Sequence, residues 1–178
     1  MEKYKKEEAP FEAARFLRGV FVERFRAPSW PAALAKLPRD LMRPVYHMAE
    51  ASMQFLQLDN GPADWERTAA AASVKHRMAV LLEMKFQLVA ALKMLEYRYS
   101  GDDKAEAVAV RECGGNHINE AKLLLMDAAT ALCAVVKTGG TDFGVAKANL
   151  YSAAYRITCE LDRLNDKLSR PAKEVRHG

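Results

Sequence analysis

The stretch from residue 65 to residue 99 contains neither glycine nor proline, and this feature constrains the fold more than any other. Apolar side chains recur along it at spacings of three and four residues, as one face of a helix requires. The stripe comprises Val74, Met78, Leu81, Leu88, Leu92, Leu95 and Tyr99, widened by Leu82, Phe86 and Val89. Its width predicts a helix that packs against more than one neighbour. At about 1.5 Å per residue the helix would extend for about 52 Å, so a bend or break near its alanine-rich start remains open.

Clusters of glycine and proline divide the remaining chain into further helices. The further expected helices cover residues 11–26, 41–58, 117–137 and 143–169, with short ones after Ser29 and over 103–112. Ser29, Asp40, Asp64 and Asp142 are candidate N-caps, and Gly139 with Gly140 is a candidate C-terminal stop. Strand-type alternation is absent from the sequence. We therefore predict an all-α fold, a helical bundle of four main helices with short additional helices.

The expected organisation is a charged N-terminal tail over residues 1–10, one helical-bundle domain over 11–170 and a flexible tail over 171–178. The charged N-terminus is unlike a secretory signal, and no stretch approaches ~18 consecutive apolar residues. These features predict a cytoplasmic protein with no membrane partner. The three widely spaced cysteines favour free thiols over a disulfide framework.

The sequence offers no cofactor motif and no convincing metal site. Cys113 and His117 are four residues apart, but no second Cys/His pair stands at ligand spacing. The phosphate-binding loop, the dinucleotide fingerprint and the nucleophile elbow of serine hydrolases are all missing. We expect neither a cofactor nor a metal.

Basic residues form two lines on predicted helices, and the chain carries a formal charge of +4. The last helix places four of them close to one line, and the first helix places three on one side. They are Arg156, Arg163, Lys167 and Arg170 on the last helix, and Arg15, Arg18 and Arg26 on the first. Two such lines brought together can follow a phosphate backbone, which is bound mainly through charge. Pairing of Glu160 with Arg156 and an ordinary solvated surface are the alternatives.

The first predicted helix carries apolar residues beyond one face, because Val20 and Val22 join Phe16 and Phe21. Such coverage on a terminal helix suggests docking against a second copy. A homo-oligomer is therefore expected.

Residues 111–117 read Arg-Glu-Cys-Gly-Gly-Asn-His, which places an arginine and a histidine six positions apart. An imidazole can move a proton at neutral pH while a guanidinium holds a phosphate. The segment resembles the R-x(4–6)-H motif of HEPN ribonucleases, which are small helical bundles. That resemblance implies a metal-independent endoribonuclease that uses Arg111 and His117 where two subunits meet. The alternative is that His117 caps a helix start and Arg111 is a surface charge.

A second resemblance involves the segment Lys36-Leu-Pro-Arg-Asp40 and the leucine- and methionine-rich helix from Lys75 to Tyr99. Together they resemble the small basic four-helix bundles of the ribosomal intervening-sequence group, which includes accessory proteins of diversity-generating retroelements. The resemblance covers residues 36–99 and implies a ring-like oligomer that assists a reverse transcriptase on its RNA. It transfers no catalytic residues.

The leading hypothesis is a non-enzymatic helical accessory protein that self-associates and binds RNA, DNA or a nucleoprotein partner through its Arg/Lys-lined helix faces. A HEPN-like endoribonuclease is the second hypothesis. The third is a purely protein-binding scaffold subunit.

Overall fold

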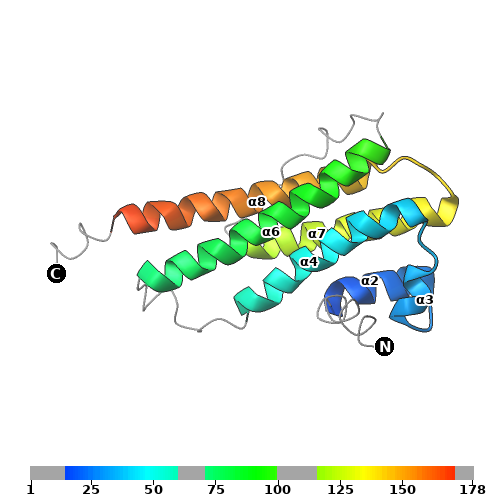
Figure 1. Ribbon diagram of the computed structural model, residues 1–178, viewed down its shortest axis with the longest axis horizontal. Helices are drawn as coiled ribbons and strands as arrows, with labels where there is room; N and C mark the ends of the chain where they lie inside the picture. Colours follow the sequence, from blue (N-terminus) through cyan, green and yellow to red (C-terminus); the bar gives the residue numbers. More distant parts are fainter. Residues whose placement is uncertain (1–14, 60–70, 100–115, 171–178) are drawn as a thin grey trace.

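The computed structural model describes residues 15–59, 71–99 and 116–170 of the chain (Figure 1). Within these ranges the regular structure is helical, and no strand occurs. The elements are α2 (Arg15–Phe25), α3 (Trp30–Leu34), the 3-10 turn η1 (Arg39–Leu41), α4 (Met42–Asp59), α6 (Ala71–Arg98), α7 (His117–Thr138) and α8 (Gly144–Ser169). The all-helical prediction is confirmed for this part of the chain.

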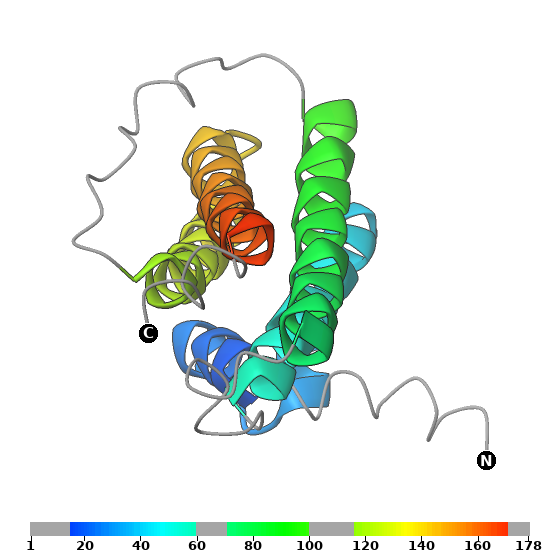
Figure 2. The same cartoon turned by 90° about the vertical axis from the view of Figure 1, so that its left-hand side faces the viewer.

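The four long helices α4, α6, α7 and α8 lie side by side along the longest axis of the molecule (Figure 1). Seen from one end, α4 lies beside α6 and α7 beside α8, and α6 packs against α8 (Figure 2). The short helices α2 and α3 contact each other, and α2 also packs on α7 and α4. Figure 1 shows α6 and α8 running in opposite directions, so the end of α6 meets the start of α8.

The core forms where the apolar stripes of these helices meet. Its largest fully buried side chains come from α2, η1, α4, α6, α7 and α8, and they are Leu17, Phe21, Leu41, Met48, Phe55, Leu81, Met84, Leu88, Leu95, Leu125, Leu132 and Leu150. Full burial of one such side chain contributes roughly 1.5–3 kcal/mol. The wide stripe of α6 is explained because this helix contacts both α4 and α8.

The apolar side chains on several faces of α2 pack against the core of the same chain. Leu17 and Phe21 are fully buried, while Val20 and Val22 are partly buried and pack against the core. Phe21 also contacts the Trp30 ring edge-on, with centroids 5.7 Å apart. This internal packing accounts for the pattern from which we predicted docking against a second copy.

Local capping follows the sequence at several helix ends. The Ser29 hydroxyl accepts a hydrogen bond from the Ala32 N–H at 3.3 Å, as predicted for a cap of α3. At the end of α7, Gly139 has φ +68°, and the N–H of Gly140 donates to the Val135 carbonyl at 3.1 Å. Glycine adopts this left-handed conformation without the steric cost that a Cβ would bring.

Two predicted caps differ from the structure. Asp40 lies inside η1 instead of capping α4, because the chain enters α4 through a 3-10 turn after Pro38. Asp142 accepts a hydrogen bond from the Gly144 N–H at 3.0 Å, but Phe143 is the residue that immediately precedes α8. The predicted cap Asp64, the short helix over 103–112 and both tails lie outside the described residues.

Buried polar contacts connect the long helices. The Lys147 ammonium of α8 donates to the Tyr99 carbonyl at 2.8 Å, just after α6 ends. Between α4 and α6, His47 Nδ1 lies 2.6 Å from Gln87 Oε1, and within α6 the Gln87 amide donates to Glu83 at 2.9 Å. These bonds fix the helices against each other at both interfaces of α6.

Candidate functional site

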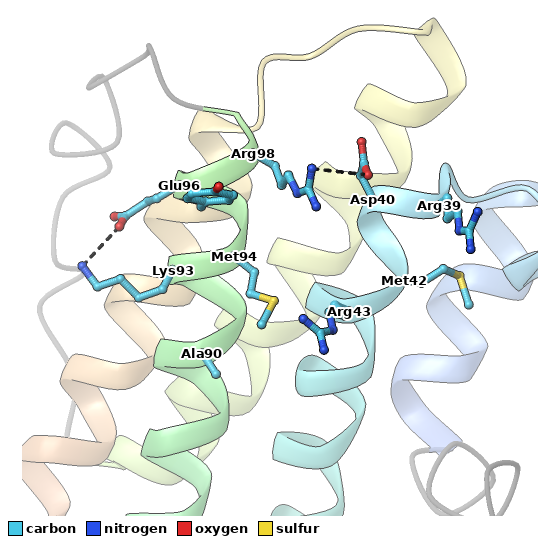
Figure 3. Close-up of a pocket in the computed structure, with 10 residues that line it drawn as sticks. Arg39, Asp40, Met42, Arg43, Ala90, Lys93, Met94, Glu96 and Arg98 are labelled. Carbon is cyan, nitrogen blue, oxygen red and sulfur yellow. Dashed lines mark hydrogen bonds and ion pairs between the residues drawn. The ribbon is translucent and has the colours of Figure 1, made fainter.

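The candidate site is a cleft between the entrance of α4 and the last turns of α6. Its volume is 1120 Å³, and its lining comes from η1, α4 and α6: Arg39, Asp40, Met42, Arg43, Ala90, Lys93, Met94, Glu96, Tyr97 and Arg98. In Figure 3, Arg43 of α4 and Met94 of α6 point into the gap between the two helices. The small side chain of Ala90 lies below them and leaves this gap open.

The local sequence explains why charged groups gather at this end. Pro38 cannot donate a backbone hydrogen bond, and it precedes a single 3-10 turn that leads into α4. Arg39, Asp40 and Arg43 are therefore presented within one and a half turns of chain. Arg98 is the last residue of α6, and one of its Nη atoms lies 3.9 Å from an Asp40 carboxylate oxygen across the cleft (Figure 3).

The cleft has a net positive charge. Its four cationic side chains are Arg39, Arg43, Lys93 and Arg98, and its two anionic ones are Asp40 and Glu96. Each carboxylate lies near a cation: Asp40 is 3.9 Å from Arg98 across the cleft, and Glu96 is 3.3 Å from the Lys93 ammonium. Within the described parts of the chain, Arg39 and Arg43 form no ion pair, and both are exposed. Two guanidinium groups are thus available to an anion.

Apolar and aromatic surface accompanies these charges. Tyr97 is 82% exposed, the highest value among the large apolar and aromatic side chains that the structure leaves exposed. The Arg98 guanidinium carbon lies 5.7 Å from the centre of the Tyr97 ring. Met42 is also exposed, and Met94 is half-buried. Cationic groups beside an open aromatic ring can bind a ligand that carries both phosphate and a flat base.

The structure places the predicted basic residues of α8 in different environments. Arg156 is only 5% exposed, and its Nη2 atom has no hydrogen-bond partner among the described residues. Arg163 donates two hydrogen bonds to Glu160, at 2.7 Å and 3.0 Å. Lys167 is half-buried, and Arg170 is exposed just after the end of α8. The basic line therefore begins in the protein interior at Arg156, whereas Arg163 and Arg170 reach solvent.

Arg156 belongs to a buried polar face of α8 that the sequence pattern did not reveal. Asn149, Ser152, Arg156 and Glu160 recur at spacings of three and four residues, and none is more than 6% exposed. Burying charged groups is costly unless they are paired. We predicted Arg156 as part of an exposed basic line, whereas the structure buries it.

The predicted basic residues of α2 do not join those of α8. Arg18 is half-buried, and Arg26 is exposed with φ 49° directly after α2 ends. Arg15 starts α2, but its side chain lies outside the described set. Helix α2 packs on α7, which in turn packs on α8. Helix α7 therefore packs between the helix that carries Arg18 and Arg26 and the helix that carries the second line.

Of the predicted pair Arg111 and His117, Arg111 lies outside the described residues. His117 is the first residue of α7, and Asn116, not His117, caps this helix by accepting from the Asn119 N–H at 3.1 Å. Within the described part of the chain, neither the buried Nδ1 atom of His117 nor the buried Oε2 atom of Glu120, one turn later, has a hydrogen-bond partner. Both atoms belong to the first turn of α7.

Thiols and carboxylates do not form a metal centre in the described chain, where no group of three or more His, Cys, Asp or Glu residues lies at ligand distance. Cys133 is buried, and burial raises the pKa of its thiol to about 12. Cys159 is partly exposed. Across ranges 15–59, 71–99 and 116–170, no helix has the length and apolarity needed to cross a membrane.

Sequence reasoning missed the cleft residues Arg39, Arg43 and Tyr97. The segment Lys36-Leu-Pro-Arg-Asp40 had been singled out for its resemblance, and it leads directly into the cleft through η1. The sequence signal for the cleft was therefore a proline followed by two arginines four residues apart. In the fold, this segment faces the C-terminal end of α6. No family model, curated protein or solved structure matches this chain.

Proposed function

We propose that this protein is a non-enzymatic helical accessory protein that binds nucleic acid, or a nucleoprotein partner, through the cleft between α4 and α6. The observation that carries the proposal is the pair Arg39 and Arg43, exposed and outside any ion pair of the described residues. Guanidinium groups bind phosphate oxygens with two hydrogen bonds at once. Phosphate contacts of this kind supply most sequence-independent affinity for nucleic acid.

In this proposal, α4, α6, α7 and α8 form a bundle of four main helices, and this bundle holds the cleft rigid. Cleft residues on η1, α4 and α6 are positioned by core side chains such as Leu41, Val45 and Leu95, which are fully buried. A site on packed helices keeps its geometry better than a site on loops. A cytoplasmic location is part of the same proposal.

Self-association is the second part of the proposal. The surface we propose for it is an exposed face of α6 and not α2, from which we first predicted it. Leu82 and Phe86 lie one helical turn apart and are 56% and 63% exposed. A patch of large apolar side chains on a helix is typical of an interaction site. A second copy can cover it, because the same helix face packed antiparallel on itself is self-complementary.

The test is binding of the full chain to a labelled structured RNA over a salt series, followed by a denaturing gel of the bound RNA. We expect binding that weakens steeply with salt and leaves the RNA intact. Arg39→Glu combined with Arg43→Glu should lower the affinity and reduce the slope of log K against log salt by about 1.4–1.8, for two lost phosphate contacts.

The matched control is Lys75→Glu combined with Lys137→Glu, which changes the net charge equally at exposed positions of α6 and α7. If both double variants lose the same affinity, net charge and not the cleft governs binding. Absence of binding at low salt would leave the protein-binding scaffold. If the wild type shortens the RNA and the His117→Ala variant leaves it at full length, the protein is the endoribonuclease instead.

A further inference from the structure

Tyr97 and the cations around it allow the ligand of the cleft to be specified more narrowly. The Tyr97 ring belongs to the last two turns of α6 and is 82% exposed, so it contributes little burial to the fold. The same turns carry Lys93, which points away from α4 toward Glu96, and Arg98, which points toward Asp40, while Arg43 lies across the gap on α4 (Figure 3). An exposed aromatic ring bordered by phosphate-binding cations is the arrangement used to hold an unstacked base.

We propose that the cleft binds a single-stranded segment of nucleic acid, with one unpaired base stacked on the Tyr97 ring and the neighbouring phosphates on Arg39 and Arg43. This inference rests on the proposed function and adds the strandedness of the ligand. Duplex bases are already stacked on each other inside the helix and offer no free face to a tyrosine. Every base has such a face once it is unpaired, so stacking does not require a particular sequence.

The dimensions of the cleft fit a short piece of a polymer. From Ala90 to Tyr97 the helix rises by about 10 Å, the length of about three stacked nucleotides at ~3.4 Å each. The volume of 1120 Å³ lies at the upper limit of the roughly 300–1,000 Å³ that is typical of ligand pockets. A strand that enters at Tyr97 and passes Arg43 would thus occupy the cleft and continue beyond it.

The acidic residues of the cleft limit where the phosphates can lie. Asp40 faces Arg98 at 3.9 Å and Glu96 lies 3.3 Å from Lys93, so a phosphate at either carboxylate would compete with an existing pair. No such competition exists at Arg39 and Arg43 in the part of the chain that the structure describes. The phosphates therefore belong on the α4 side, and the base belongs on the α6 side.

The experiment measures fluorescence anisotropy of a short, unstructured RNA with the full chain at fixed salt. The duplex with its complementary strand and a free nucleoside monophosphate serve as competitors. Tyr97→Ala should weaken single-strand binding roughly five- to one-hundred-fold, the loss of one stacked base, while Tyr97→Phe keeps the ring and the affinity. The salt slope should not change in either variant, because neither removes a phosphate contact.

Tyr151→Ala is the matched control, since Tyr151 is also an exposed tyrosine and lies on α8, outside the cleft. Equal affinity of wild type and Tyr97→Ala, with both still binding RNA, would overturn stacking but leave the proposed function intact. Failure of the wild type to bind any nucleic acid would overturn both. Displacement by the free nucleotide at the same concentration as by the oligonucleotide would show that the cleft holds a small molecule and not a strand.

Discussion

Replacing Glu160 with glutamine tests the finding that part of the α8 charge serves stability. The Glu160 side chain is 6% exposed and accepts two hydrogen bonds from Arg163, at 2.7 Å to one oxygen and 3.0 Å to the other. Glutamine has almost the same shape but no charge, and only one of its two terminal atoms can accept. Glu160→Gln therefore removes one of the two bonds and the ion pair without opening a cavity.

The size of the effect follows from the unequal exposure of the two partners. Exposed ion pairs contribute about 0–1 kcal/mol, whereas breaking a fully buried pair costs about 3–5 kcal/mol. Glu160 is buried, but the Arg163 side chain is 45% exposed, so solvent screens part of the interaction. We expect a loss of about 2 kcal/mol. For a chain of this size that corresponds to a decrease of about 4–8 °C in Tm.

The assay is thermal unfolding followed by circular dichroism, with Glu96→Gln as the matched control. Glu96 also pairs with a cation on its own helix at a separation of three, but its side chain is 45% exposed and that of Lys93 is 71% exposed. Its loss should lower Tm by less than about 2 °C. Equal shifts in the two variants would refute the argument that burial determines the contribution of Glu160.

The same contact affects how binding experiments on α8 are interpreted. A carboxylate introduced at position 163 would face the buried Glu160 and repel it. Arg163→Glu is therefore expected to destabilise the fold whether or not Arg163 touches nucleic acid. Arg170→Glu does not share this problem, because Arg170 is exposed beyond the end of α8.

Two further outcomes test other parts of the structure. Phe86→Glu should shift the full chain toward the monomer in light scattering, because it places a charge in the proposed contact between copies. The control Tyr151→Glu, at an equally exposed aromatic position on α8, should leave the mass unchanged. An unaltered mass for Phe86→Glu would contradict this interface. In a Cys113→Ser background, a thiol reagent at neutral pH should label Cys159 and spare Cys133, whose pKa burial raises to about 12. The folded state retains this proton while the unfolded thiol ionises near 9.0, so stability present below pH 9.0 should be lost as the pH rises toward 12. Rapid labelling of both thiols would contradict the burial of Cys133.

The helices were predictable because their signals are local. The apolar spacing in α6, the cap at Ser29 and the stop at Gly139 each depend on residues within a few positions of one another. Asp40 shows where such reasoning fails, since Pro38 and Asp40 permit either an α-helical N-cap or a 3-10 turn. The structure contains the turn, and the sequence pattern alone does not distinguish the two.

The cleft was not predictable because its parts are distant in the chain. Arg43 and Met94 come from different helices, and only the antiparallel packing of α4 on α6 brings them face to face. Helical periodicity assigns each charged residue to a side of its own helix. It does not say whether that side meets solvent, another helix or a carboxylate, and for Arg156 this missing information reversed the prediction.

Stability and binding are separable in this architecture because the two sets of arginines differ in their surroundings. Arg156 is buried in the interior and Arg163 is paired with Glu160, so changing either residue alters the folded state first. Arg39 and Arg43 lie on the solvent side of α4 and η1, where charge reversal removes no described ion pair. Exposed cations without partners cost the fold little and remain available to phosphate, which is why the cleft and not the longer arginine line of α8 is the better candidate for nucleic acid.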